Sequence, residues 1–125
     1  MKIKEFLIVI ILLVFIGGGI GFMVYSGNQP DKLDSFASCL KDKKATFFGA
    51  FWCPHCQTQK AMFGRSERLL SYVECSTPDG NAQTKICIDN KIKSYPTWEF
   101  ADGSRETGEV PLQKLAEKTG CELPK

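Results

Sequence analysis

An uninterrupted apolar segment near the N-terminus constrains the fold of this chain more than any other feature. Residues 6–25 contain no charged side chain and begin FLIVIILLVF. As an α-helix, these 20 residues would span about 30 Å, the thickness of the hydrocarbon core of a bilayer. Lys2 and Lys4 precede the segment, and the positive-inside rule then places the N-terminus in the cytoplasm. We expect a single-pass anchor in the cytoplasmic membrane, with the rest of the chain on the extracytoplasmic side.

A cleaved signal peptide is the alternative interpretation of the same segment. Its hydrophobic part would cover residues 6–16, followed by a glycine-rich stretch at 17–21. No Ala-x-Ala-like cleavage site follows, and Ser26-Gly27 is only a weak candidate, so the uncleaved anchor is favoured. Both alternatives export the remainder of the chain, which therefore folds in an oxidising environment.

The exported part has the length of one domain. Residues 26–32, SGNQPDK, are polar, contain Gly and Pro, and are typical of a short tether. Residues 33–125 then form a single compact domain. Of the 16 Lys/Arg and 14 Asp/Glu in the chain, Lys2, Lys4 and Glu5 lie before the apolar segment, which leaves 14 basic and 13 acidic residues beyond it. This balance gives no electrostatic basis for binding nucleic acid.

Hydrophobic periodicity predicts alternating helices and strands in the exported domain. We expect a helix at 33–41, a strand at 45–52, a helix from Pro54, a strand at 71–75 and a helix at 82–90. A hairpin of strands 97–101 and 104–108 and a last helix from Pro111 to Gly120 then follow. The run 45–52, ATFFGAFW, is apolar on both faces, as in a central strand, and Phe47, Phe48 and Phe51 are expected in the core. Ile86 and Cys87 are expected to face inward. The pattern predicts a mixed α/β fold.

The segment Cys53-Pro54-His55-Cys56 directly follows the predicted central strand. Pro54 suits the first turn of a helix, and the spacing of the cysteines places both thiols on one face of that helix. At the helix N-terminus, free N–H groups and the helix dipole favour the thiolate of Cys53, which is the nucleophile in disulfide exchange, while Cys56 resolves the mixed disulfide. A protonated His55 adds a positive charge beside Cys53. A stabilised thiolate is also a better leaving group, which favours an oxidant.

A zinc site is the alternative for a Cys-x-x-Cys pair. Zinc takes four ligands, usually from two such pairs or from one pair plus spaced histidines. This chain has one histidine, which lies within the pair, and its other cysteines are scattered. The pattern favours redox chemistry at Cys53 and Cys56, with no metal and no other cofactor.

The residues around the cysteine pair resemble a known family. FWCPHC, followed about forty residues later by Tyr95-Pro96-Thr97, resembles the thioredoxin superfamily over residues 33–123. Together with YVEC and SYPTWEF, FGAFWCPHC is similar to the thioredoxin-like domain fused to bacterial vitamin K epoxide reductase homologues. The resemblance implies a thioredoxin-like fold, with a central mixed sheet flanked by helices, and protein disulfide oxidoreductase activity. It also implies that Cys53 is the exposed nucleophile and Cys56 the resolving cysteine.

The same resemblance implies roles for the neighbours of the pair. Pro96 would form a cis peptide bond and pack against the cysteines, which leaves the backbone of Tyr95 to hold an extended substrate. Pro-His between the cysteines matches the strongly oxidising periplasmic disulfide oxidase. Phe47 occupies the position of the buried acid of thioredoxins, so deprotonation of Cys56 needs another group or water. Trp52, next to Cys53, either contacts the substrate or shapes the pocket.

The resemblance further implies the kinds of partner. In the fused family, the domain exchanges electrons with a membrane quinone reductase. A quinone-linked membrane oxidoreductase related to vitamin K epoxide reductase is therefore expected as a separate chain, and exported proteins with thiols or disulfides are the expected substrates.

Four cysteines remain for structural disulfides. Cys75 ends a predicted strand, and Cys87 lies on the helix reached through the turn-rich loop 76–81, so this local pair is favoured. Cys39 and Cys121 either form a second disulfide or remain free, and an oxidising compartment favours the disulfide.

These features predict a membrane-anchored thiol–disulfide oxidoreductase that acts on protein thiols as an oxidase or isomerase. One alternative is a disulfide reductase fed by a membrane electron carrier. The others are a thiol-based metal-binding module and a non-catalytic domain in which Cys53–Cys56 is a structural staple. A reactive, alkylatable cysteine after mild reduction distinguishes a redox site from a staple.

Overall fold

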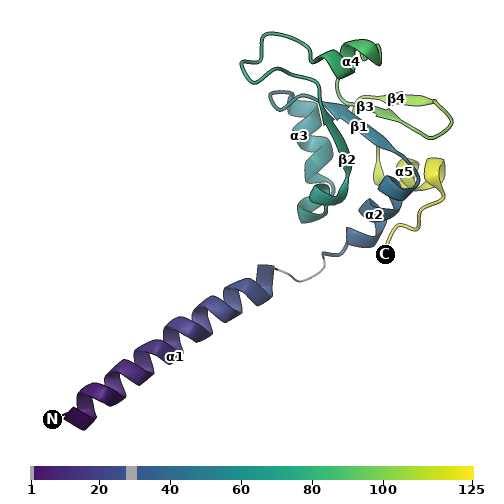
Figure 1. The fold of residues 1–125 in the computed structure, drawn as a ribbon. Coiled ribbons are helices and arrows are strands. Elements are labelled where there is room, and N and C mark those ends of the chain that lie inside the picture. The colour runs from purple at the N-terminus through teal and green to yellow at the C-terminus, as the bar shows by residue number, and fades with distance from the viewer. Residues whose placement is uncertain (1, 28–30) are drawn as a thin grey trace. The chain divides into compact units, whose positions relative to one another are not determined.

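The computed structural model describes residues 2–27 and 31–125, which fall into an N-terminal unit, Met1–Pro30, and a globular unit, Asp31–Lys125 (Figure 1). The N-terminal unit contains one helix, α1 (Lys2–Gly27). Its segment Lys2–Tyr25 is long and apolar enough to cross a membrane, a property that a signal sequence would share. Within the predicted tether, Ser26 and Gly27 are still helical, residues 28–30 lie outside the described residues, and 31–32 belong to the globular unit.

The globular unit has the predicted order of elements with one addition, the 3₁₀ helix η1. The elements are α2 (Asp34–Asp42), β1 (Thr46–Gly49), α3 (Pro54–Ala61), η1 (Gly64–Leu69), β2 (Ser71–Glu74), α4 (Lys85–Asp89), β3 (Thr97–Glu99), β4 (Arg105–Thr107) and α5 (Leu112–Thr119). The strands form one sheet in the order β2-β1-β3-β4. β1 pairs with β2 in parallel and with β3 antiparallel, and β3 and β4 form a hairpin. This mixed sheet flanked by helices is the thioredoxin-like fold expected from the sequence (Figure 1).

The aromatic strand β1 is the centre of the core. Its successive side chains point to opposite faces of the sheet, which explains why both Phe47 and Phe48 are buried. Phe47 stacks on Trp98 of β3 and belongs to a cluster with residues of α2, α3 and α5. Phe48 packs in a second cluster with Cys75, Cys87 and Ile92. Because strands flank β1 on both edges and side chains cover both of its faces, its C-terminal end is a rigid support for the segment that follows.

Two residues expected in the core are exposed. β1 ends at Gly49, and Phe51 lies in the turn before α3 with 49% of its surface exposed. In α4, Cys87 is buried whereas Ile86 is half exposed. Cys87 is the buried residue of this five-residue helix and is joined to Cys75, and Ile86, about 100° away around the helix axis, faces outward. The prediction of an inward Ile86 was therefore wrong, as was that of a buried Phe51.

Two disulfides lie within the globular unit. Cys75, directly after β2, is joined to Cys87 of α4, and Cys39 of α2 is joined to Cys121, directly after α5. Gly120 ends α5 with a left-handed backbone (φ 73°), which turns the chain toward Cys39. Cys53 and Cys56 are free thiols.

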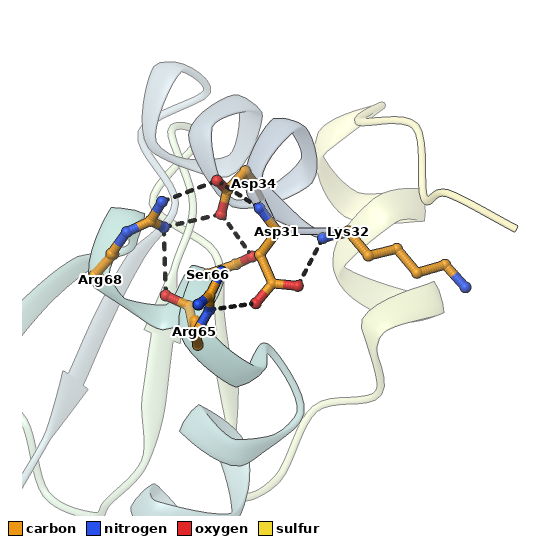
Figure 2. Close-up of polar contacts among 6 residues, drawn as sticks. All are labelled: Asp31, Lys32, Asp34, Arg65, Ser66 and Arg68. Carbon is orange, nitrogen blue, oxygen red and sulfur yellow. Dashed lines mark hydrogen bonds and ion pairs between the residues drawn. The ribbon is translucent and has the colours of Figure 1, made fainter. Parts of the chain in front are cut away.

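A network of polar side chains ties the beginning of the globular unit to η1 (Figure 2). The Asp34 carboxylate accepts hydrogen bonds from Nη1 and Nη2 of Arg68, both at 2.9 Å, and from the Ser66 hydroxyl at 2.8 Å. It also accepts from the backbone N–H of Asp31 at 3.0 Å, and Arg65 pairs with the Asp31 carboxylate at 3.3 Å. These hydrogen bonds, of which the one from the Arg68 guanidinium has the largest effect, hold the pKa of Asp34 well below its usual range.

Candidate active site

Cys53 occupies the N-cap position of α3, where the buried strand passes into the helix. Its backbone is extended (φ −79°, ψ 117°), and Pro54 is the first residue of the helix. The Cys53 sulfur accepts a hydrogen bond from the backbone N–H of Cys56 at 3.3 Å. This N–H is one of the groups that a helix N-terminus leaves without an intrahelical partner. The sulfur therefore stands where a side-chain oxygen caps many helices, and negative charge on it is stabilised there.

The second wall of the site is the loop before β3. The backbone oxygen of Tyr95 lies 3.7 Å from the Cys53 sulfur, and the following bond, Tyr95–Pro96, is cis. Pro96 itself is fully buried. The fold thus brings Cys53 and the Tyr95–Pro96 segment together although they are about forty residues apart in the sequence.

Trp52, next to Cys53, contacts the loop after β2 and the loop before β3. Its indole N–H donates to the Ser76 hydroxyl at 2.9 Å, and its ring packs edge-on against Tyr95 with the centroids 6.0 Å apart. The Tyr95 hydroxyl accepts a hydrogen bond from Gln83 at 2.7 Å. Trp52 is nevertheless half exposed, and with Tyr95 and residues of the segment 75–83 it lines a cavity of about 210 Å³. Trp52 therefore shapes the surface beside Cys53 and remains accessible.

The two thiols differ in accessibility. Cys53 has 5% of its surface exposed and Cys56 has 1%, so the thiol expected to be the exposed nucleophile is only slightly more accessible than its partner. Burial first, and then the hydrogen bond with Cys53, raise the pKa of the Cys56 thiol to about 12. Gly49 leaves room for the Cys56 sulfur, because a Cβ at position 49 would stand 3.1 Å from it. Near neutral pH, Cys56 consequently keeps its proton.

His55 points into solvent beside the pair, with 70% of its side chain exposed. Its Nδ1 lies 3.5 Å from a carboxylate oxygen of Glu109, in the segment between β4 and α5. Sequence reasoning did not identify Glu109, which is 54 positions from His55 along the chain. The His55 imidazole is therefore open to solvent and has a carboxylate beside it.

Gln59 is a second residue that sequence reasoning missed. Its side chain is fully buried, donates to the backbone oxygen of Val110 at 3.0 Å and accepts from the Val110 N–H at 2.6 Å. This pair of bonds fastens the segment that carries Glu109 to α3. The only sequence signal is a polar residue three positions after Cys56, on the inward face of the same helix.

The described residues, 2–27 and 31–125, include no group of three or more His, Cys, Asp or Glu side chains placed to hold a metal ion. Cys53 and Cys56 are two thiols 3 residues apart at a helix N-terminus.

The chain was compared with known protein families and curated proteins. No family model matches it. A segment of the protein named thiol-disulfide oxidoreductase LTO1, from Arabidopsis thaliana, is 46% identical over 105 residues, which cover 80% of this chain. The chain spans about a quarter (27%) of the length of that relative. Most of this chain is thus similar in sequence to one part of a protein named as a thiol–disulfide oxidoreductase, and its globular unit has a thioredoxin-like fold.

Proposed function

We propose that this chain exchanges disulfides with protein thiols through Cys53 and Cys56, as an oxidase or isomerase. The observation that carries the proposal is the position of the Cys53 sulfur, which the N–H of Cys56 caps on one side and the Tyr95 carbonyl faces on the other. The similarity to a thiol–disulfide oxidoreductase over most of the chain supports the same reaction class.

In the oxidase direction, a substrate thiolate attacks the Cys53 sulfur of the Cys53–Cys56 disulfide. A bond forms between the substrate sulfur and Cys53, and the Cys56 thiolate leaves and takes a proton. A second substrate thiolate then attacks the first substrate sulfur, and Cys53 leaves as a thiolate. The substrate has lost two electrons and gained a disulfide, and the cysteine pair has been reduced. We assign the first attack to Cys53, because the Cys56 thiolate is the leaving group and the Tyr95 backbone lies beside the Cys53 sulfur.

The surroundings of Cys53 favour its role as a leaving group. The helix N-terminus stabilises its thiolate, and a protonated His55 adds to that effect. Both influences stabilise the reduced form of the pair and raise its reduction potential, as in an oxidant. The peptide group of Tyr95, beside the sulfur, is the backbone edge on which an extended substrate would lie.

The location and the recharging partner are also parts of the proposal. The apolar helix Lys2–Tyr25, whose first turn carries Lys2 and Lys4, supports a single-pass anchor with the globular unit on the extracytoplasmic side. The resemblance of FGAFWCPHC, YVEC and SYPTWEF to domains fused to vitamin K epoxide reductase homologues supports a quinone-linked membrane oxidoreductase as the partner. Exported proteins with thiols or disulfides are the proposed substrates.

A direct assay tests the proposed reaction. The full chain, oxidised and held in detergent micelles, is mixed with a reduced peptide that contains two cysteines. We expect the mass of the peptide to fall by that of two hydrogen atoms as its disulfide forms, and Cys53→Ser to abolish this. The reductase alternative predicts a different result. The oxidised wild-type chain would leave the dithiol peptide reduced, and the reduced chain would reduce a peptide that contains a disulfide.

A further inference from the structure

If the chain exchanges disulfides as proposed, the reduced cysteine pair reacts with a disulfide, and Cys56 must then lose its proton. The question is which group accepts that proton. Cys56 is buried, and Phe47 next to it on β1 is apolar. The raised pKa of Cys56 means that its thiolate does not form readily without a proton acceptor. The polar groups around the sulfur therefore decide how fast it can attack.

Tyr72 of β2 is the residue that connects Cys56 to a polar network. Its ring edge and the Cys56 sulfur both lie about 3 Å from the point where a Cβ of Gly49 would stand, so the two groups meet in the space that this glycine leaves open. Tyr72 is the register partner of Phe47 on the neighbouring strand, and their rings pack edge to face. The Tyr72 hydroxyl donates a hydrogen bond of 2.7 Å to the Glu74 carboxylate.

Glu74 is held in place by two backbone groups. Its other carboxylate oxygen accepts hydrogen bonds from the N–H of Ser76 at 2.9 Å and from the N–H of Phe51 at 3.2 Å. Because Phe51 lies in the turn that leads to Cys53, the carboxylate is fixed relative to the cysteine pair. It accepts the hydrogen bond of the Tyr72 hydroxyl, and the edge of the Tyr72 ring lies against Gly49 as the Cys56 sulfur does.

Lys60 completes the network from the side of α3. Its ammonium group lies 3.7 Å from the centre of the Tyr72 ring, and its positive charge opposes the rise in the pKa of Cys56. The side chains that shift the pKa of Cys56 are Cys53, the N-cap of α3, and Lys60. Burial first, then Glu74 and the two cysteines, raise the pKa of the Tyr72 hydroxyl. Phe47, Lys60 and Tyr72 also line a cavity of about 230 Å³ with Glu67, Arg68 and Leu70, which gives this network access to solvent.

We propose that the Tyr72–Glu74 pair accepts the proton that Cys56 releases when it resolves a mixed disulfide, and that Lys60 stabilises the thiolate formed. In this step the Cys56 sulfur forms a bond to the Cys53 sulfur, and the bond between Cys53 and the substrate sulfur breaks. The substrate sulfur leaves with the electron pair as a thiolate and is protonated by solvent. The Cys56 proton passes through a water molecule to the Tyr72 oxygen as the Tyr72 hydroxyl proton passes to Glu74, and Glu74 returns it to solvent.

The test separates the two chemical steps of a single turnover. The reduced full chain in detergent micelles is mixed with oxidised glutathione, quenched with acid at successive times and weighed by mass spectrometry. The mixed disulfide of Cys53 with glutathione appears in the first step, and the Cys53–Cys56 disulfide replaces it in the second. We expect Tyr72→Phe and Glu74→Gln to form the mixed disulfide at the wild-type rate, but to resolve it at least about tenfold more slowly at pH 7.

The pH dependence distinguishes proton transfer from a structural role. In both variants the resolving rate should rise with pH and approach the wild-type rate at high pH, because hydroxide replaces the missing acceptor. Tyr72→Phe keeps the ring that packs on Phe47, and Glu74→Gln keeps an oxygen for the N–H groups of Ser76 and Phe51. Lys60→Met should shift the profile to higher pH. Glu117→Gln, the same change on an exposed residue of α5, is the matched control and should leave the profile unchanged.

Each outcome bears on one conclusion. Wild-type resolving rates and an unchanged pH profile in Tyr72→Phe and Glu74→Gln would overturn the inference and leave the proposed function intact. If the variants have a lower melting temperature but a pH profile of the resolving rate parallel to that of the wild-type chain, the network has a structural role. That result would also overturn the inference. If the wild-type chain forms no mixed disulfide at Cys53, the proposed function itself fails.

Discussion

The Cys53 sulfur and the backbone N–H of Cys56 are joined by a hydrogen bond of 3.3 Å, so the peptide group of one cysteine stabilises the sulfur of the other. The two thiols are otherwise unequal. Cys53 caps the helix, whereas burial raises the pKa of Cys56 to about 12. The geometry therefore assigns different steps of disulfide exchange to the two residues.

Cys53 is expected to be the attacking thiol. The variant Cys56→Ser should accumulate mixed disulfides with substrate proteins, because nothing resolves them, whereas Cys53→Ser should accumulate none. Non-reducing electrophoresis of cells expressing each variant, followed by identification of the trapped species, measures this. Equal trapping by the two variants would contradict the assignment.

The Cys75–Cys87 disulfide is expected to survive conditions that reduce Cys53–Cys56. Structural disulfides have lower reduction potentials than catalytic ones, and Cys75 and Cys87 are both fully buried. Mass mapping of alkylated peptides after mild dithiol treatment checks the order of opening. Replacing both cysteines with serine should lower the free energy of unfolding by roughly 3 kcal/mol on a chain-entropy model. Simultaneous opening of the two bonds would count against a structural role.

His55→Gly is expected to lower the reduction potential of the cysteine pair. A protonated His55 and the helix N-terminus both stabilise the Cys53 thiolate, so the wild-type potential should lie above about −270 mV, as in thioredoxin, and nearer about −120 mV, as in the periplasmic oxidase. Every ~30 mV corresponds to about 1.4 kcal/mol. Equilibration of the full chain with glutathione buffers measures both potentials. A wild-type value at or below that of thioredoxin, unmoved by His55→Gly, would favour a reductase.

The Asp34–Arg68 pair is expected to make folding stability depend on acid. Because the folded protein holds the pKa of Asp34 below its usual value, the unfolded state binds the proton more readily. The contribution is therefore fully present above the ordinary pKa of an aspartate, about 3.9, and is lost as the pH falls below it. Thermal unfolding of Asp34→Asn should lack this part of the acid sensitivity and begin from a lower melting temperature at pH 7.

Asp42→Asn provides the matched control for that experiment. Asp42 is the last residue of the same helix and is exposed. Its replacement should leave the acid dependence of the melting temperature close to that of the wild-type chain. If Asp34→Asn and Asp42→Asn behave alike, the Asp34 network shown in Figure 2 contributes nothing measurable.

Gln59→Ala is expected to destabilise the globular unit and to loosen the segment that carries Glu109. The change leaves the buried N–H and carbonyl of Val110 without their side-chain partners, at a cost of about 1–3 kcal/mol for each group. Gln113→Ala, at an exposed position of α5, is the control and should change the free energy of unfolding little. Chemical denaturation of the full chain in micelles measures both. Equal stability of the two variants would show that the Val110 bonds are replaced by water.

The amino-acid sequence by itself determined those properties that depend on residues near one another along the chain. The apolar run at 45–52 and the helical patterns predicted the order of elements, and Pro54 and Gly120 marked where helices begin and end. The spacing of Cys53 and Cys56 predicted two thiols at a helix N-terminus. These features are local because backbone hydrogen bonding and side-chain periodicity act over a few residues.

Only the tertiary structure decided which distant side chains meet. Tyr72 and Glu74 reach the surroundings of Cys56 because β2 pairs with β1 in one register, and Gln59 reaches Val110 across 51 positions of sequence. The exposure of Phe51 and Ile86 likewise followed from where β1 ended and from which face of α4 the Cys75–Cys87 disulfide turned inward. Such contacts depend on packing and strand register, to which residues far apart in the chain contribute together, and no local pattern encodes them.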